Sequence, residues 1–84
     1  MHFVQIEMSN ERLAENVKYS VLDNKLARFV TVVGSTRSFT VENGIKDTKA
    51  FVVTFQTENL EEVKTMMTDP TMRVASMCAW EMAA

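Results

Sequence analysis

The sequence of 84 residues predicts one α+β domain spanning residues 1–84, with a four-stranded antiparallel sheet and two helices. Segments with strand-like alternation lie near both ends, two segments have helical periodicity, and a weak internal repeat relates the two halves. The repeated residues are Phe3-Val4 with Phe51-Val52, Val17-Lys18 with Val63-Lys64, and Asp23 with Asp69. Each half therefore has the order strand, helix, break at an aspartate, short segment and strand.

The first strand and the first helix follow from side-chain spacing. In residues 2–8, HFVQIEM, the side chains alternate as in a strand with one buried face. Asn10 can cap a helix, and Glu11 suits its first turn. The apolar residues that then share one helical face are Leu13, Ala14, Val17 and Val21. We expect a helix from about Asn10 to Leu22.

The stretch DNKLARFVTVVG, residues 23–34, has two interpretations. The residues spaced as on one helical face are Leu26, Phe29, Val30 and Val33. The run FVTVV within it is also strongly β-prone. Because the repeat pairs Asp23 with Asp69, Asp23 could cap a short helix that ends at Gly34. We therefore predict a helix from Asn24 to Val33, with a strand as the alternative.

The second half of the chain predicts three strands and one helix. STRSFTVE has strand composition, Asn43-Gly44 is a turn dipeptide, and the polar residues after it suit a loop. AFVVTFQT is the clearest strand. In ENLEEVKTMM, Asn59 and Glu62 have capping-box spacing, which predicts a helix. Asp69 can cap a short restart after it, with Pro70 in the first position, and CAWEMAA is interpreted as the last strand.

The elements together have the ferredoxin-like order strand, helix, strand, strand, helix, strand. The first and third strands then lie in the centre of the sheet, and both helices cover one face. The residues predicted on the covered face are Val4, Ile6, Met8, Phe39, Val41, Phe51, Val53, Phe55, Trp80 and Met82. Those predicted on the opposite face are Phe3, Gln5, Glu7, Ser38, Thr40, Val52, Thr54, Gln56 and Glu81.

Polar side chains on the uncovered face make the candidate site. Glu7 and Glu81 could lie on adjacent strands. The predicted ligand pocket consists of Gln5, Glu7, Thr54, Gln56 and Glu81. A second sheet packed over it would exclude water, and a carboxylate buried there could act as a general base. The alternative is that these groups form hydrogen bonds across a wet subunit interface, or face solvent.

Composition argues against several classes of function. The nine basic and eleven acidic residues are interspersed, so we expect no nucleic-acid partner. No long apolar run and no signal-peptide pattern is visible, so we expect no membrane partner and a cytoplasmic location. The single histidine, His2, and the single cysteine, Cys78, make no metal-ligand cluster. We predict no metal and no cofactor, and expect Cys78 to be a buried, inert thiol.

The chain resembles small, uncharacterised members of the dimeric α/β-barrel superfamily, through VGSTRSF, KAFVVTFQTENLEEVKTMMTDP and the closing strand. In that superfamily two ferredoxin-like subunits pack sheet to sheet around an enclosed space, so the resemblance implies a homodimer through the free sheet face. Relatives include antibiotic-biosynthesis monooxygenases, haem-degrading enzymes and muconolactone isomerase-like proteins. The haem-degrading branch uses an Asn, Trp and His constellation, from which this chain departs because His2 and Trp80 lie on the first and last strands.

Two classes of function therefore stay open. The first is a homodimeric protein that binds a small molecule or has an accessory role, since no complete catalytic set is visible. The second, by analogy with the relatives, is a cofactor-independent monooxygenase or isomerase that acts on a small aromatic or carbonyl compound, with Glu7 as the candidate base.

Overall fold

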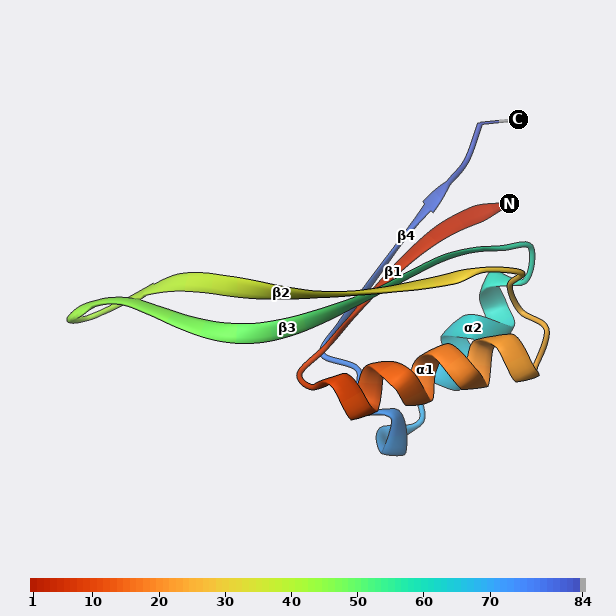
Figure 1. Cartoon of the computed structure of the whole chain (residues 1–84). Coiled ribbons are helices and arrows are strands. Elements are labelled where there is room, and N and C mark those ends of the chain that lie inside the picture. The colour runs from red at the N-terminus through yellow and green to blue at the C-terminus, as the bar shows by residue number, and fades with distance from the viewer. Residues whose placement is uncertain (84) are drawn as a thin grey trace.

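The computed structural model describes residues 1–83 and contains a four-stranded antiparallel sheet with two helices against one face (Figure 1). Its elements are β1 (His2–Met8), α1 (Glu11–Asp23), β2 (Val30–Val41), β3 (Gly44–Thr57), α2 (Leu60–Met67), the 3-10 helix η1 (Pro70–Met72) and β4 (Ser76–Glu81). The strand order is β2-β3-β1-β4, so β1 and β3 lie in the centre. The predicted ferredoxin-like fold is confirmed.

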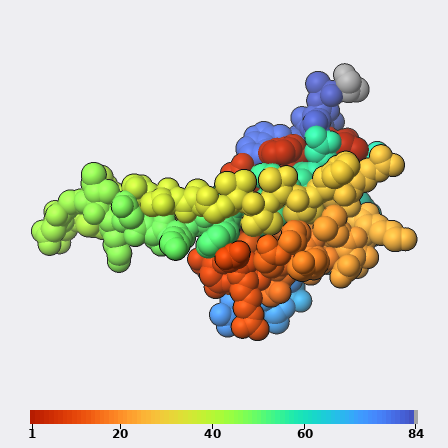
Figure 2. All heavy atoms as spheres, viewed as in Figure 1, coloured from red at the N-terminus to blue at the C-terminus, as the bar shows by residue number. Residues whose placement is uncertain are grey.

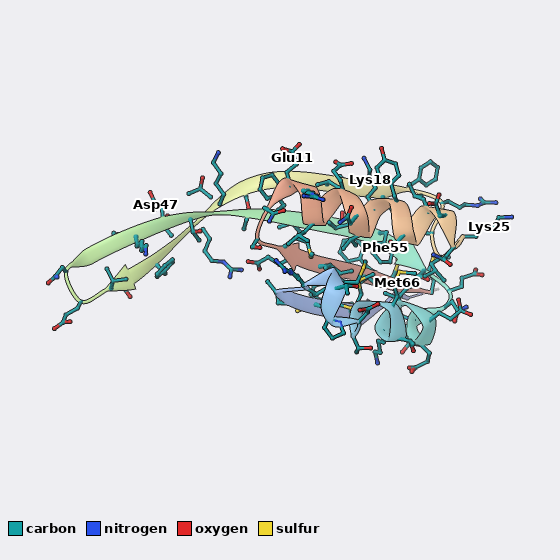
Figure 3. The ribbon with its side chains drawn as sticks, turned by 90° about the horizontal axis from the view of Figure 1, so that it is seen from below. Glu11, Lys18, Lys25, Asp47, Phe55 and Met66 are labelled. Carbon is teal, nitrogen blue, oxygen red and sulfur yellow. The ribbon has the colours of Figure 1, made fainter. Side chains whose placement is uncertain are left out.

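The core lies between the sheet and the helices. Figure 3 views this helical side and labels Phe55 of β3 and Met66 of α2, which both pack in the layer. The buried cluster consists of Val4, Ile6, Met8, Ala14, Val17, Val21, Leu26, Val53, Phe55, Val63 and Met67. Because burial of each large apolar side chain stabilises the fold by roughly 1.5–3 kcal/mol, this layer holds the helices on the sheet.

The other side of the sheet is called the free face. Directly paired residues of an antiparallel ladder point to the same side, so the register identifies its members. They are Phe3, Gln5, Glu7, Thr31, Val33, Ser35, Arg37, Phe39, Val41, Lys46, Thr48, Ala50, Val52, Thr54, Gln56, Ser76, Cys78 and Trp80. The predicted faces of β1 and of residues 51–56 are confirmed, since these strands alternate in the expected phase.

The helix predicted over residues 24–33 is wrong, because α1 ends in a Schellman motif. Lys25 has a left-handed backbone with φ of 56°, and its N–H donates to the Leu22 carbonyl at 3.0 Å. The Leu26 N–H donates to the Val21 carbonyl at 3.0 Å, and the Leu26 side chain enters the core. Pairing with β3 then starts at Val30, so the alternative interpretation, a strand, is correct from that residue onward.

β2 and β3 extend beyond the helices as a hairpin, called the arm, which comprises residues 35–50 (Figures 1 and 2). The strands stay paired up to Val41 and Gly44, so only Glu42 and Asn43 connect them. Gly44 has φ of +140°, a region that favours glycine. The loop predicted after this turn is wrong, because residues 45–50 continue β3 and pair with residues 35–40 of β2. The arm lengthens the molecule to 44 × 29 × 20 Å.

The faces predicted for the arm are also reversed. Val33 pairs with Val52 and lies on the free face, and the alternation carries Phe39 and Val41 to that same side. Ser38 and Thr40 therefore point the other way. The β2 residues of the arm are exposed on both sides, so their apolar pattern does not indicate which side faces the helices.

The second helical region has the predicted elements but a different start. The Asn59 side chain makes no capping hydrogen bond, so the capping box is wrong; instead the Asn59 N–H donates to the Thr57 hydroxyl at 3.0 Å. Asp69 does cap η1, with Pro70 in its first turn, as predicted. No helix among residues 1–83 is long and apolar enough to cross a membrane.

The register of β4 corrects the faces predicted for its residues. Phe3 pairs with Trp80, whose side chain therefore lies on the free face, and His2 pairs with Glu81, which lies on the opposite side. Both Trp80 and Glu81 are exposed. β4 is an edge strand whose residues are mostly exposed. Its burial pattern therefore does not indicate which of its alternating side chains face the helices.

Two further expectations for the end of the chain are wrong. Met82 is expected on the covered face, but it follows the last residue of β4 and is 39% exposed. Cys78 is expected to be a buried thiol, but it is free and exposed. It lies on the free face, which the two helices do not cover.

Candidate functional site

Four of the five predicted site residues lie on the free face. Gln5 pairs with Thr54 across β1 and β3, and Phe3 pairs with Gln56. Glu7 lies two residues from Gln5 on the same side. Glu81 is the exception, because the register of β4 places it on the opposite side of the sheet from Glu7. The predicted pair of neighbouring carboxylates therefore does not form.

Glu7 is held by two polar neighbours. The Arg37 guanidinium forms an ion pair and hydrogen bond with Glu7 Oε2, and the Ser76 hydroxyl lies 3.4 Å from the same oxygen. The Glu7 side chain is 13% exposed and that of Arg37 is 55% exposed. Arg37 belongs to β2, and the pairing of β2 with β3 brings its side chain over the sheet. The ion pair could therefore not be predicted without the register of the arm. The arrangement favours a structural role for Glu7.

A cleft opens at the edge of the free face and is called the edge cleft. Its volume is about 520 Å³, and its lining residues are Met1, Phe3, Arg28, Phe29, Thr31, Thr54, Phe55 and Gln56. This volume is within the range of roughly 300–1,000 Å³ that small-molecule sites occupy. Of the predicted site residues it includes Thr54 and Gln56, whereas Gln5, Glu7 and Glu81 are not among its lining residues.

The strands and the segment after α1 contribute different parts of the edge cleft. Thr31 and Thr54 are direct partners across β2 and β3, and they supply hydroxyl groups to its sheet side. Arg28 and Phe29 come from the segment between α1 and β2. Phe29 is 82% exposed, a large apolar side chain left open to solvent. The edge cleft therefore combines polar sheet residues with apolar walls and one charged side chain.

A second, larger cleft adjoins the first. It has a volume of about 860 Å³ and is lined by Met1, Leu22, Lys25, Leu26, Ala27, Arg28, Gln56, Glu58 and Asn59. Arg28 and Gln56 line both clefts. The larger cleft lies at the end of α1 and carries charges of both signs, from Lys25, Arg28 and Glu58. The edge cleft differs from the larger cleft in that its lining contains aromatic side chains and the predicted Thr54.

Beside the edge cleft, an aromatic pair spans β1 and β4. The ring centroids of Phe3 and Trp80 lie 5.8 Å apart with an interplanar angle of 35°. This is within the usual separation for interacting aromatic side chains. Trp80 remains 49% exposed, so this pair leaves apolar surface on the free face.

Metal-ligating groups are dispersed in the described part of the chain. Among residues 1–83, no three or more His, Cys, Asp or Glu side chains gather closely enough to hold a metal ion. Arg28, Phe29 and Thr31 also line the edge cleft but were not predicted there, because the sequence placed all three in a helix. Their signal is the β-prone run that begins at Phe29, the alternative interpretation of that stretch.

Comparisons with known proteins identify the fold but no family. No protein-family model matches the chain, and no curated protein matches it in sequence. Solved structures do match over the whole chain. The periplasmic divalent cation tolerance protein CutA from Archaeoglobus fulgidus is 23% identical with a TM-score of 0.74, and the match covers 100% of this chain and 86% of that one.

Two further structures give the same result. CutA from Pyrococcus horikoshii in 3 M guanidine hydrochloride is 18% identical with a TM-score of 0.78. The divalent cation tolerance protein from Thermus thermophilus is 19% identical with a TM-score of 0.69. Both matches cover 100% of this chain and 86% of the other chain. At such identities the likeness establishes a shared fold and leaves function to be argued from the site.

Proposed function

We propose that the chain is a small-molecule-binding protein with an accessory, non-catalytic role, and that its ligand occupies the edge cleft. The observation that carries this proposal is the cleft itself, where Thr54 and Gln56 meet aromatic walls in a volume of about 520 Å³. The ion pair of Glu7 with Arg37 supports the non-catalytic part, because it engages the one carboxylate that was a candidate base.

We also propose that the protein associates with a second copy of itself through the free face, as a homodimer of sheets. The free face carries exposed apolar side chains at Val33, Phe39, Val41 and Trp80. A chain of this length buries only about 60% of its unfolded surface, so covering this face would add stability. A partner sheet over Thr31 and Thr54 would also enclose the edge cleft, which is open in a single chain.

A ligand screen tests the binding function. Purified protein is screened by thermal shift against a library of small organic molecules, with divalent cations as a separate arm because the structural neighbours are named for tolerance of such cations. We expect organic compounds that raise Tm, and expect their effect to be lost in Gln56→Ala. The matched control is Gln5→Ala, which lies on the free face outside the cleft lining.

Two kinds of result would contradict the proposal. The first is a negative screen, in which no organic compound raises Tm or in which Gln5→Ala and Gln56→Ala reduce the shift equally. The second is turnover of a small aromatic or carbonyl compound that is abolished in a folded Glu7→Gln variant. That second result would replace the proposal by a cofactor-independent monooxygenase or isomerase.

We propose a cytoplasmic location as well, on the sequence pattern alone. One of the structural neighbours, from Archaeoglobus fulgidus, is described as periplasmic, so the location is tested by fractionating cells that produce the protein. Recovery in the periplasmic fraction would overturn it.

A further inference from the structure

We infer that the ligand of the edge cleft is a flat aromatic carboxylate, whose acid group binds Arg28 and whose ring packs against Phe3 and Phe29. This inference rests on the proposed small-molecule-binding function and specifies the ligand class of the same site. Its basis is the charge, the hydrogen-bonding groups and the apolar surface of the cleft.

The charge of the cleft is positive. Arg28 is the only ionisable side chain among its lining residues, and no ion pair within residues 1–83 engages it. A guanidinium remains protonated at any physiological pH and presents its N–H groups in a plane that matches a carboxylate. Arg37 of β2, by contrast, is already paired with Glu7. The guanidinium of Arg28 at the cleft is therefore unpaired, and its complement is an anion.

The uncharged polar groups of the cleft also suit an anion. Thr31 and Thr54 supply hydroxyl groups, and Gln56 supplies an amide, each of which can donate a hydrogen bond to a carboxylate oxygen. Within the part of the chain that the structure describes, no side-chain hydrogen bond engages these three residues. Because Thr31 and Thr54 are direct cross-strand partners, their side chains are neighbours on one side of the cleft.

The apolar surface of the cleft is the reason why the proposed ligand has an aromatic ring. Phe29 is 82% exposed although it is a large apolar residue, and Phe3 lines the same cleft. Exposed apolar surface beside polar groups is typical of a binding site. Planar rings pack on phenyl groups with favourable edge or offset geometry. A volume of about 520 Å³ has room for a ligand with one or two rings.

The test compares three probes that share one ring system and differ in charge. Naphthoate is the anion, naphthamide is the neutral analogue and naphthylmethylammonium is the cation. Binding of each is measured by calorimetry and by chemical-shift changes in isotope-labelled protein. We expect naphthoate to bind more tightly than both analogues, and expect its shifts to include the backbone amides of Phe29, Thr31 and Gln56.

The decisive variant is Arg28→Gln. Because Arg28 is exposed and outside the core, the substitution should leave the fold intact. We expect naphthoate affinity to fall about tenfold or more, as loss of a charge-assisted hydrogen bond predicts, while naphthamide affinity stays unchanged. The matched control is Arg12→Gln on α1, also exposed and outside the cleft, which should leave both affinities unchanged.

Three outcomes would overturn the inference. Equal binding of naphthoate and naphthamide would remove the anion from the ligand class while leaving small-molecule binding intact. An equal loss in Arg28→Gln and Arg12→Gln would show a general charge effect. If none of the three probes binds, the ligand class is wrong, and the wider screen by Tm decides separately whether the site binds any small molecule.

Discussion

At the scale of single residues, two carboxylates of this protein differ in how far along the chain their hydrogen-bond donors lie. Glu7 is engaged by Arg37 from β2 and by Ser76 from β4, so its neighbours come from distant parts of the chain. Asp69 is engaged by its own neighbour Thr71, through the backbone N–H at 2.9 Å and the hydroxyl at 2.8 Å. The first arrangement needs the whole sheet, whereas the second forms within one turn.

The pKa of Asp69 provides a prediction at this scale. Donation from the backbone N–H of Thr71 and then from its hydroxyl holds the pKa of Asp69 below the usual 3.8. Thr71→Val removes the hydroxyl and keeps the N–H, so we expect the pKa to rise part of the way toward 3.8. An NMR titration of the Asp69 carboxyl measures this. Thr65→Val is the control, because the Thr65 hydroxyl donates to the Glu61 carbonyl instead.

The sign of the pH effect follows from the direction of the shift. Because the folded pKa of Asp69 is lower than the unfolded one, its contribution to stability is present above about pH 4 and is lost as pH falls through the folded pKa. Thr71→Val should therefore weaken the dependence of stability on pH in this acidic window. An unchanged pKa in Thr71→Val would show that the backbone N–H alone accounts for the shift.

At the scale of elements, the end of α1 determines where the candidate site lies. The Schellman motif at Lys25 and Leu26 reverses the chain and leaves only residues 27–29 before β2 begins. That short segment brings Arg28 and Phe29 to the rim of the edge cleft. A longer α1 would have carried both side chains away from Thr31 and Thr54.

A substitution at Lys25 tests the energetics of this helix end. Lys25 has φ of 56°, which costs a residue with a side chain roughly 1–2 kcal/mol relative to glycine. Lys25→Gly should therefore stabilise the fold, by about 0.5–1 kcal/mol once the extra freedom of glycine in the unfolded chain is included. Urea unfolding measures the change. The control Lys64→Gly, inside α2, should destabilise by about 1 kcal/mol. Equal effects of the two variants would contradict this account.

At the scale of the whole molecule, the arm and the free face leave apolar surface in solvent. Figures 1 and 2 show the arm projecting from the body that the helices cover. Along it, Phe39 and Val41 extend the side of the sheet that carries Val33. A second copy placed on this side would cover both the body and part of the arm, which is the physical basis of the proposed homodimer.

Val33→Lys tests that assembly. Val33 is 52% exposed in the single chain, so a lysine there costs little in a monomer but would place a charge within the proposed interface. Light scattering after size exclusion should give about twice 9.6 kDa for the unmodified protein and a shift toward monomer for Val33→Lys. Tyr19→Lys, at a residue of α1 that is 56% exposed, is the control and should stay dimeric. A monomeric unmodified protein, or dimers of both variants, would overturn the proposal.

Features of this protein that depend on residues close together in the sequence could be predicted from the sequence. The alternation of Val4, Ile6 and Met8 and the helical spacing of Ala14, Val17 and Val21 identify β1, α1 and the core between them. Asp69 as a cap is likewise a contact within a few residues. Thr54 and Gln56 share one face of β3 and line the edge cleft, and their role in ligand binding stays a prediction.

The features that sequence reasoning missed depend on contacts between distant residues. Residues 24–33 have both helical spacing and β propensity, and pairing with β3 decided for a strand from Val30 onward. Trp80 and Glu81 each lie on the face opposite to the one predicted. The pairing of β4 with β1 determines these faces, and the alternation of residue types in β4 does not. Arg37 reached Glu7 only because the arm continues the sheet.

The sequence by itself determined the order of the elements and the core that joins β1, β3 and the helices, since periodicity and capping act over a few neighbouring residues. Only the tertiary structure decided which side chains surround the edge cleft and which carboxylate stays paired. Those depend on strand register and on the point where α1 stops, and both are set by hydrogen bonds and burial between segments far apart in the chain.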